Sequence, residues 1–211
     1  MSQVLELGSG AGYFGIGLLK SNLNVSQYTF TDAHYNVLNT LMANVEINLK
    51  SGGDVDNNCM KQWLETGPPQ RVDRSKIERT LVTFPIDHER VAFVRYLDWL
   101  QCTDEFIDTL DYNVIVGSDL TYTLSMLLPL AQLIRRLLSK KKAAFGNEIA
   151  AYIACTHRDA DTVNAFLHHS AEVGLSCTAV IKSSFGPNDG LTITHEPLRP
   201  VTIYKFGYSE P

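Results

Sequence analysis

Cysteine is scarce in this sequence, and its four occurrences suit neither a disulfide framework nor a metal site. Cys59, Cys102, Cys155 and Cys177 never form a C-x-x-C pair, and the six histidines show no H-E-x-x-H spacing. Disulfide-rich domains and zinc sites depend on such close, regular spacing. The sequence therefore predicts an intracellular, cytoplasmic protein with reduced thiols and no bound metal.

Long apolar runs and an excess of positive charge are also missing. No stretch approaches the ~20 apolar residues that span a bilayer, and no basic N-terminal segment leads into an apolar one. The formal net charge is -5, and the one dense basic run, 140–142, falls at the end of a predicted helix, where cations are favourable. We therefore expect no membrane partner and no direct nucleic-acid partner.

Short apolar runs alternate with amphipathic segments along the 211 residues, and this alternation is typical of strand-helix units around a parallel sheet. It predicts one α/β domain over residues 1–211, Rossmann-like, with a seven-stranded, mostly parallel sheet and helices on both faces. Polar residues with Gly and Pro at 51–84 indicate a surface insertion, and 185–190 indicates a turn. The predicted strands are 4–7, 27–31, 91–97, 112–117, 148–155, 176–183 and 201–206, and the predicted helices are 13–20, 34–49, 104–110, 126–139 and 159–173.

The clearest motif is V-L-E-L-G-S-G-A-G at residues 4–12, a short apolar strand with an acidic residue and a glycine-rich turn. Glycines let the backbone approach a ligand closely, and the helix that follows presents unpaired N–H groups. A dinucleotide loop would read G-x-G-x-x-G, but Tyr13 occupies the third glycine position. Glu6 would repel a pyrophosphate and attract the ammonium and sulfonium of S-adenosylmethionine. The motif therefore predicts that cofactor, with a plain tight turn as the alternative.

Two further segments at strand ends fit the rest of this cofactor. Asp32 follows Gly8 by 24 residues, a spacing at which a carboxylate can accept both ribose hydroxyls, although it could instead cap the helix that begins near His34. Asp98 and Trp99 follow the third predicted strand, where a carboxylate could accept from the adenine amine and an indole could cover the base. A tryptophan in the core is the alternative for Trp99.

The fourth predicted strand ends in S-D-L-T-Y, residues 118–122. Ligands of open α/β sheets bind beyond the carboxyl ends of the strands, so Asp119 and Tyr122 are predicted to face the methyl acceptor. Aminomethyltransferases of nucleic acids usually carry Asn or Asp followed by Pro-Pro and an aromatic residue here, and this sequence does not.

The string Glu6–Gly12, the pair Asp98-Trp99 and the D-x-x-Y string from Asp119 to Tyr122 resemble the family 16 seven-β-strand protein methyltransferases, which have the Class I fold. Within that family the sequence is most similar to the elongation factor 2 lysine methyltransferases. The resemblance covers most of the chain except the insertion. It extends to Asp32-Ala33-His34, Asn44-Val45, Tyr96-Leu97, Arg135-Arg136 and Thr156-His157-Arg158.

The resemblance implies that Asp119 and Tyr122 face the acceptor. Our own hypothesis is that Asp119 positions the acceptor ammonium, that Tyr122 shapes the acceptor channel, and that burial beside the sulfonium favours the neutral amine. By the resemblance, the cofactor would be lined by Gly8, Ser9 and Gly10, held at its ribose by Asp32, contacted at adenine by Trp99 and met by the backbone of Ser118.

The implied function is an S-adenosylmethionine-dependent protein-lysine N-methyltransferase that acts as a monomer on elongation factor 2. Alternatives are a methyltransferase for another protein lysine or a small molecule, and a non-catalytic cofactor-binding module. Met1 lies three residues before Val4, where the first predicted core strand opens. We therefore expect the chain to lack the upstream N-terminal region, with its tryptophan, that family members carry.

Overall fold

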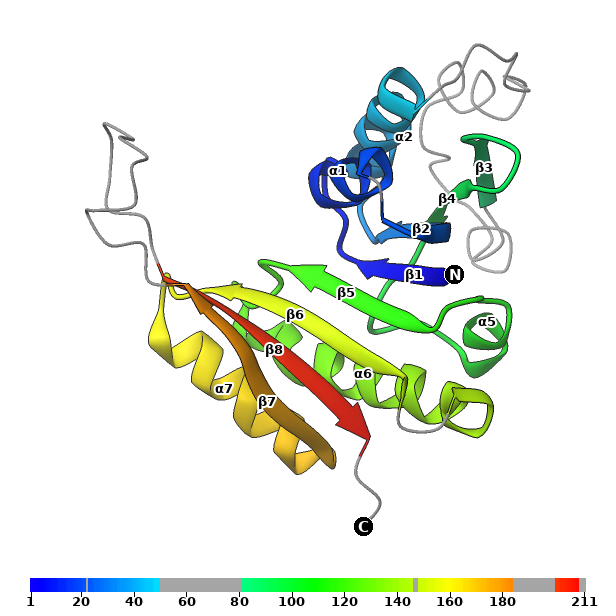
Figure 1. Ribbon diagram of the computed structural model, residues 1–211. Coiled ribbons are helices and arrows are strands. Elements are labelled where there is room, and N and C mark those ends of the chain that lie inside the picture. Colours follow the sequence, from blue (N-terminus) through cyan, green and yellow to red (C-terminus); the bar gives the residue numbers. More distant parts are fainter. Residues whose placement is uncertain (22, 50–80, 146–147, 184–199, 209–211) are drawn as a thin grey trace, which may run out of the picture. The chain divides into compact units, whose positions relative to one another are not determined.

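The computed structural model describes residues 1–21, 23–49, 81–145, 148–183 and 200–208 (Figure 1). Their contacts divide the chain into two compact units, Met1–Val116 and Gly117–Pro211. The prediction of one domain over 1–211 stays a prediction. None of the helices in the described ranges is long and apolar enough to cross a membrane.

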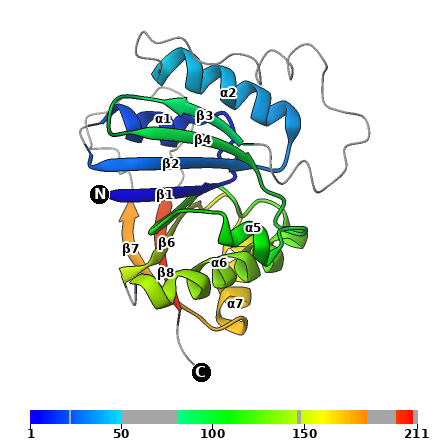
Figure 2. The ribbon, with the colours of Figure 1, turned by 90° about the vertical axis from the view of Figure 1, so that its right-hand side faces the viewer.

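The first unit consists of strands with helices α1 and α2 on one face (Figure 2). Hydrogen bonds join its strands in the order β3-β4-β2-β1-β5. The pairs β1/β2 and β2/β4 are parallel, and β3/β4 is antiparallel. The elements are β1 (Ser2–Leu7), α1 (Tyr13–Lys20), β2 (Val25–Asp32), α2 (Tyr35–Leu49), β3 (Leu81–Pro85), β4 (Val91–Tyr96), α5 (Asp104–Asp108) and β5 (Val114–Ser118), whose last two residues belong to the second unit.

The core of this unit follows from the residue periodicity. Alternate residues of β2, including Tyr28 and Phe30, face α1 and α2, because successive side chains of a strand point to opposite faces. Helix α2 buries Leu38, Leu41, Met42, Val45 and Leu49, which recur at helical spacing. Gly15 lets α1 approach β2 closely, since a Cβ there would lie 2.3 Å from a Phe30 ring carbon.

The second unit contains antiparallel strands and two helices that pack on each other. Its strands are joined in the order β6-β8-β7, with both pairs antiparallel. The rings of Phe166 and Phe206 meet edge to face at 5.3 Å between helix and sheet. The elements are α6 (Leu124–Phe145), β6 (Ala150–Thr156), α7 (Ala160–Glu172), β7 (Leu175–Ser183) and β8 (Val201–Tyr208).

All seven predicted strands and all five predicted helices are present, and the Rossmann-like prediction is confirmed. One correction concerns the number of strands, because the described residues form eight. The predicted insertion 51–84 ends in β3, where Val82 and Phe84 are buried and Thr83 is exposed in a strand-like alternation. Residues 51–80 and the predicted turn at 185–190 lie outside the described residues.

Candidate active site

The glycine turn after β1 has the backbone that the motif predicts. Gly8, Gly10 and Gly12 have φ angles of 60°, 54° and 85°, in the left-handed region that favours glycine. A Cβ at Gly10 would meet no atom of the described residues within 4 Å, whereas one at Gly12 would lie 2.5 Å from Leu41 Cδ1. Gly10 therefore borders open space above the turn, and Gly12 allows the turn to pack on α2.

Backbone and hydroxyl groups fasten this turn to the end of β2. The Ser9 N–H donates to the Thr31 carbonyl at 2.7 Å, and the Thr31 N–H donates to Ser9 Oγ at 3.0 Å. The Thr31 hydroxyl donates to the Glu6 carbonyl at 2.6 Å. From α2, the Asn44 amide donates to the Ala11 carbonyl at 2.9 Å. The loop is thus held on two sides before any ligand is bound.

Glu6 is the buried acidic group of the site. Its side chain is 3% exposed, and Oε2 has no hydrogen-bond partner in the part of the chain that the structure describes. Burial raises the pKa of Glu6 from its usual 4.5 to about 7; the hydroxyls of Ser9 and Tyr28 act against this rise and the Asp32 charge adds to it. A positively charged ligand would stabilise the carboxylate form.

Asp32 connects the glycine turn with the start of α2. Its Oδ2 accepts the Gly10 N–H at 3.2 Å, and its Oδ1 accepts the His34 N–H at 2.9 Å. The His34 bond reaches the residue before α2, so Asp32 supports the entry to the helix and does not cap its first turn. The carboxylate is only half-buried, so lone pairs remain for further donors. Its ribose contact stays a prediction.

Asp98 and Trp99 follow β4, which pairs directly with β2. The Leu97 N–H donates to the Asp32 carbonyl at 3.0 Å and brings this segment to the end of β2. The Asp98 carboxylate accepts the Leu100 N–H at 2.9 Å, so it shapes the turn that carries Trp99. Trp99 is half-buried rather than fully in the core. The predicted adenine contacts of both side chains stay predictions.

These residues fit S-adenosylmethionine by their chemistry. The turn presents open space at Gly10, Glu6 holds an unpaired buried oxygen for a cation, and Asp32 holds a half-buried carboxylate at the adjoining strand end. Among the described residues no cluster of three or more metal-ligating side chains occurs.

In the second unit, Asp119 directly follows β5 and has an unusual backbone. Its φ of 55° is left-handed, which is rare for residues other than glycine, although Asp and Asn tolerate it best. Its N–H donates to the Ala154 carbonyl of β6 at 2.9 Å. Its carboxylate accepts the Thr156 N–H at 3.3 Å and pairs with Arg158 at 2.7 Å. Such strain at the end of a strand is a feature of functional sites.

Asp119 and Tyr122, predicted together, do lie together around one recess of about 220 Å³. Tyr122 is 72% exposed, so its ring is available to a partner. The neighbouring Ser118 is exposed, and its contact with the cofactor stays a prediction. The remaining lining residues were not predicted as site residues: Thr121, Thr156, Arg158, Asp159 and Thr162. Thr156, Arg158 and Asp159 lie directly at the carboxyl end of β6. The rule that ligands bind beyond the carboxyl ends of the strands, which was applied to β5, could have identified them.

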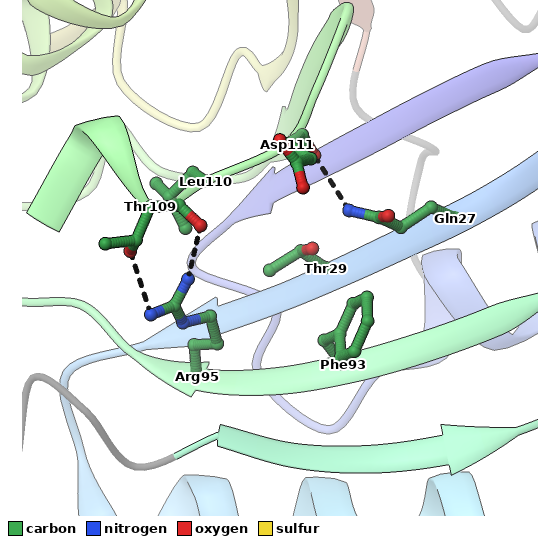
Figure 3. Close-up of a pocket in the computed structure, with 7 residues that line it drawn as sticks. All are labelled: Gln27, Thr29, Phe93, Arg95, Thr109, Leu110 and Asp111. Atoms are coloured by element: carbon green, nitrogen blue, oxygen red, sulfur yellow. Dashed lines mark hydrogen bonds between the residues drawn. The ribbon is translucent and has the colours of Figure 1, made fainter.

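A second recess, of about 120 Å³, lies in the first unit and contains none of the predicted site residues (Figure 3). Arg95 donates from one guanidinium nitrogen to the Thr109 carbonyl at 3.1 Å and from another to the Thr109 hydroxyl at 3.0 Å. Across the recess, the Gln27 amide donates to the Asp111 carbonyl at 3.0 Å. These bonds tie β2 and β4 to the segment after α5, which gives the recess a structural role.

The fold is that of the Rossmann-like methyltransferases. Aeropyrum pernix fibrillarin, solved with natively bound S-adenosylmethionine, aligns with a TM-score of 0.53 at 9% identity over 97% of this chain and 66% of its own. The precorrin-6y C5,15-methyltransferase of Geobacter metallireducens aligns with a TM-score of 0.51 at 11% identity over 99% of this chain and 80% of its own. At such identities the likeness concerns the fold alone.

The chain belongs to the lysine methyltransferase family, whose sequence profile matches residues 1–83 and 83–170. This confirms the family resemblance. Relatives are the protein-lysine N-methyltransferases EEF2KMT of Bos taurus (29% identical over 172 residues, 82% of this chain and 45% of the relative) and Mus musculus (26% over 202 residues, 96% and 50%). The Homo sapiens protein of the same name is 28% identical over 172 residues, 82% of this chain and 43% of its own. The chain thus spans about half the length of these curated relatives.

Proposed function

We propose that the chain is an S-adenosylmethionine-dependent protein-lysine N-methyltransferase whose substrate is elongation factor 2. The observation that carries the proposal is the recess of Asp119 and Tyr122, a carboxylate and an exposed aromatic ring directly beyond the carboxyl end of β5. A carboxylate there suits a cationic acceptor such as a lysine ammonium, and the ring suits the alkyl stem behind it.

The first unit supplies the cofactor residues of the proposal. Glu6 would face the positive charges of S-adenosylmethionine, the backbone at Gly8, Ser9 and Gly10 would line it, and Asp32 would accept its ribose hydroxyls. When bound, S-adenosylmethionine supplies the methyl group. Asp98 and Trp99 would contact the adenine, and the backbone of Ser118 would complete the site.

At the acceptor end, the chain's residues mainly have to align a nucleophile and make it neutral. Asp119 positions the lysine nitrogen, and Tyr122 shapes the channel along which the side chain enters. A lysine with a reference pKa of ~10.4 must lose its proton to act as a nucleophile. Desolvation in the recess and a neighbouring positive charge both lower that pKa.

The family and the name shared by three mammalian relatives support a protein lysine as the acceptor and elongation factor 2 as the protein. That substrate belongs to the cytoplasm, and we place the chain there as a monomer.

The test is to incubate the chain with S-adenosylmethionine and purified elongation factor 2 and to locate methylated lysines by mass spectrometry. Methylation of one lysine, lost in Asp119→Asn, is the expected result. Modification of other proteins or of a small amine instead would reassign the substrate. Cofactor binding by calorimetry without any transfer would indicate a non-catalytic cofactor-binding module.

A further inference from the structure

Arg158 forms an ion pair with the Asp119 carboxylate, which is the group proposed to bind the acceptor lysine. Its Nη2 lies 2.7 Å from Asp119 Oδ2, and the Thr156 N–H donates to Asp119 Oδ1 at 3.3 Å. Both carboxylate oxygens of Asp119 therefore already have donors. Arg158 and Thr156 also line the same recess, directly at the carboxyl end of β6.

We propose that Arg158 is a positioning residue that holds the Asp119 carboxylate and offsets its charge, so that the acceptor lysine meets a paired carboxylate. The inference rests on the proposed function, because it concerns how that site treats a lysine. Arg158 is 61% exposed and Asp119 40%, so the pair is open to solvent and contributes little to stability. We therefore look for the effect of the Arg158–Asp119 pair in the reaction and not in the stability of the fold.

The charges around the recess determine what Arg158 does there. Asp119 and Asp159 contribute two negative charges and Arg158 one positive charge, with Tyr122 as the further ionisable group of the lining. Cys155, the residue before Thr156 on β6, is buried, and burial raises the pKa of its thiol to about 11. His157 contacts Thr202 on β8 at 2.8 Å and is not part of the lining. Counted over the lining residues that the structure describes, the net charge is minus one with Arg158 and minus two without it.

The additional negative charge in the absence of Arg158 would strengthen binding of the lysine ammonium but would slow methyl transfer. Two unbalanced carboxylates would bind a lysine ammonium more tightly and would keep it protonated. Transfer needs the neutral amine: the ammonium gives one proton to solvent, and the nitrogen lone pair forms the N–C bond as the S–C bond breaks. The sulfur leaves as a neutral thioether. Arg158 therefore weakens ground-state binding of the cation and favours the reactive form.

The test compares pH–rate profiles of the full chain with those of Arg158→Gln and Arg158→Lys, using elongation factor 2 as substrate. In Arg158→Gln the pH at which kcat reaches half its maximum should rise by about one unit, the effect of losing one close opposing charge. At neutral pH kcat should fall about tenfold, while KM stays equal or falls. Arg158→Lys restores the positive charge and should return the profile to that of the unmodified chain.

Arg90→Gln is the matched control. Arg90 also pairs with an aspartate, Asp87, at 2.6 Å, but in the first unit, so its loss should leave the profile in place. A lower kcat in Arg158→Gln with an unmoved profile, or no rescue by lysine, would overturn the inference and leave the proposed function standing. A chain that binds S-adenosylmethionine and methylates no lysine would overturn both.

Discussion

The backbone N–H of Gly10 donates to Oδ2 of Asp32 at 3.2 Å, which joins the glycine turn after β1 to the end of β2. The same carboxylate also accepts the N–H of His34, the residue directly before α2. A ligand placed against the open side of Gly10 would therefore lie beside a carboxylate that is already oriented.

Replacing Gly10 with valine should abolish S-adenosylmethionine binding, because the branched side chain would fill the open space where the ligand must approach. Calorimetry measures the loss. Gly17→Val is the matched control, since a Cβ at Gly17 also meets no described atom within 4 Å, but Gly17 lies inside α1. This variant should bind S-adenosylmethionine with unchanged affinity. A folded Gly10→Val protein with unchanged affinity would remove the glycine turn from the cofactor site.

Glu6 should make the stability of the ligand-free protein depend on pH. The pKa in the folded protein, about 7, lies above the usual 4.5, so the stabilising effect of the protonated carboxyl is complete below about pH 4.5 and is lost as the pH rises through about 7. The loss should be on the order of 3 kcal/mol. Denaturant unfolding of the unmodified chain and of Glu6→Gln across this pH range measures the loss. If the unfolding free energy of both proteins depended on pH in the same way, Glu6 would not be its source.

The same carboxyl should link cofactor affinity to pH. A cationic ligand favours the ionised Glu6, so binding below about pH 7 should release a proton, and the affinity should rise as the pH increases through that value. Calorimetry in two buffers of different ionisation enthalpy measures the released proton. Glu6→Gln should bind more weakly and release none; equal proton release from both proteins would place the titrating group elsewhere.

Trp99→Ala should weaken S-adenosylmethionine binding roughly tenfold, about 1.4 kcal/mol, as expected for a lost base contact. The ligand-free melting temperature should change by only a few degrees, because the side chain is half-buried. Phe93→Ala is the control, since Phe93 is also half-buried on β4 but lines the recess of Arg95. A large melting drop in Trp99→Ala with unchanged affinity would return Trp99 to the core.

Asp119→Asn should lower methyl transfer at least a hundredfold, a typical effect for a positioned polar group at a reacting centre, and should leave cofactor affinity unchanged. Asparagine keeps the shape and tolerates the left-handed backbone, so the variant tests the charge. Steady-state kinetics and calorimetry measure the two quantities. Asp87→Asn, which removes a comparable arginine pair in the first unit, should be silent. Normal turnover in Asp119→Asn would exclude Asp119 from the mechanism.

Local patterns in the sequence were sufficient for most of the fold, because each strand and helix has its own periodicity. The exception, β3, lies at the end of a polar, glycine- and proline-containing stretch, and its Val82 and Phe84 become recognisable only by their burial against the first unit's core. A strand that gains its stability from a neighbour carries a weak signal of its own.

The residues of the candidate site also differ in how readily the sequence reveals them. Glu6, Gly10 and Asp32 stand out because a strand, an acid and glycines occur at fixed spacing. Arg158 does not, since its partner Asp119 is 39 residues away and only the pairing of strand ends reveals the contact. Long-range ion pairs depend on topology, which short windows of sequence do not contain.

The left-handed backbone of Asp119 also limits how this site can change. Glutamate keeps the charge, but it adopts φ 55° less readily, and its longer side chain would carry the carboxylate past both the Thr156 N–H and Arg158. An exchange that is conservative by charge is therefore not conservative by geometry. A mutant library aimed at a new acceptor would keep position 119 constant and vary Tyr122 and Thr162, which line the recess from segments with ordinary backbone angles.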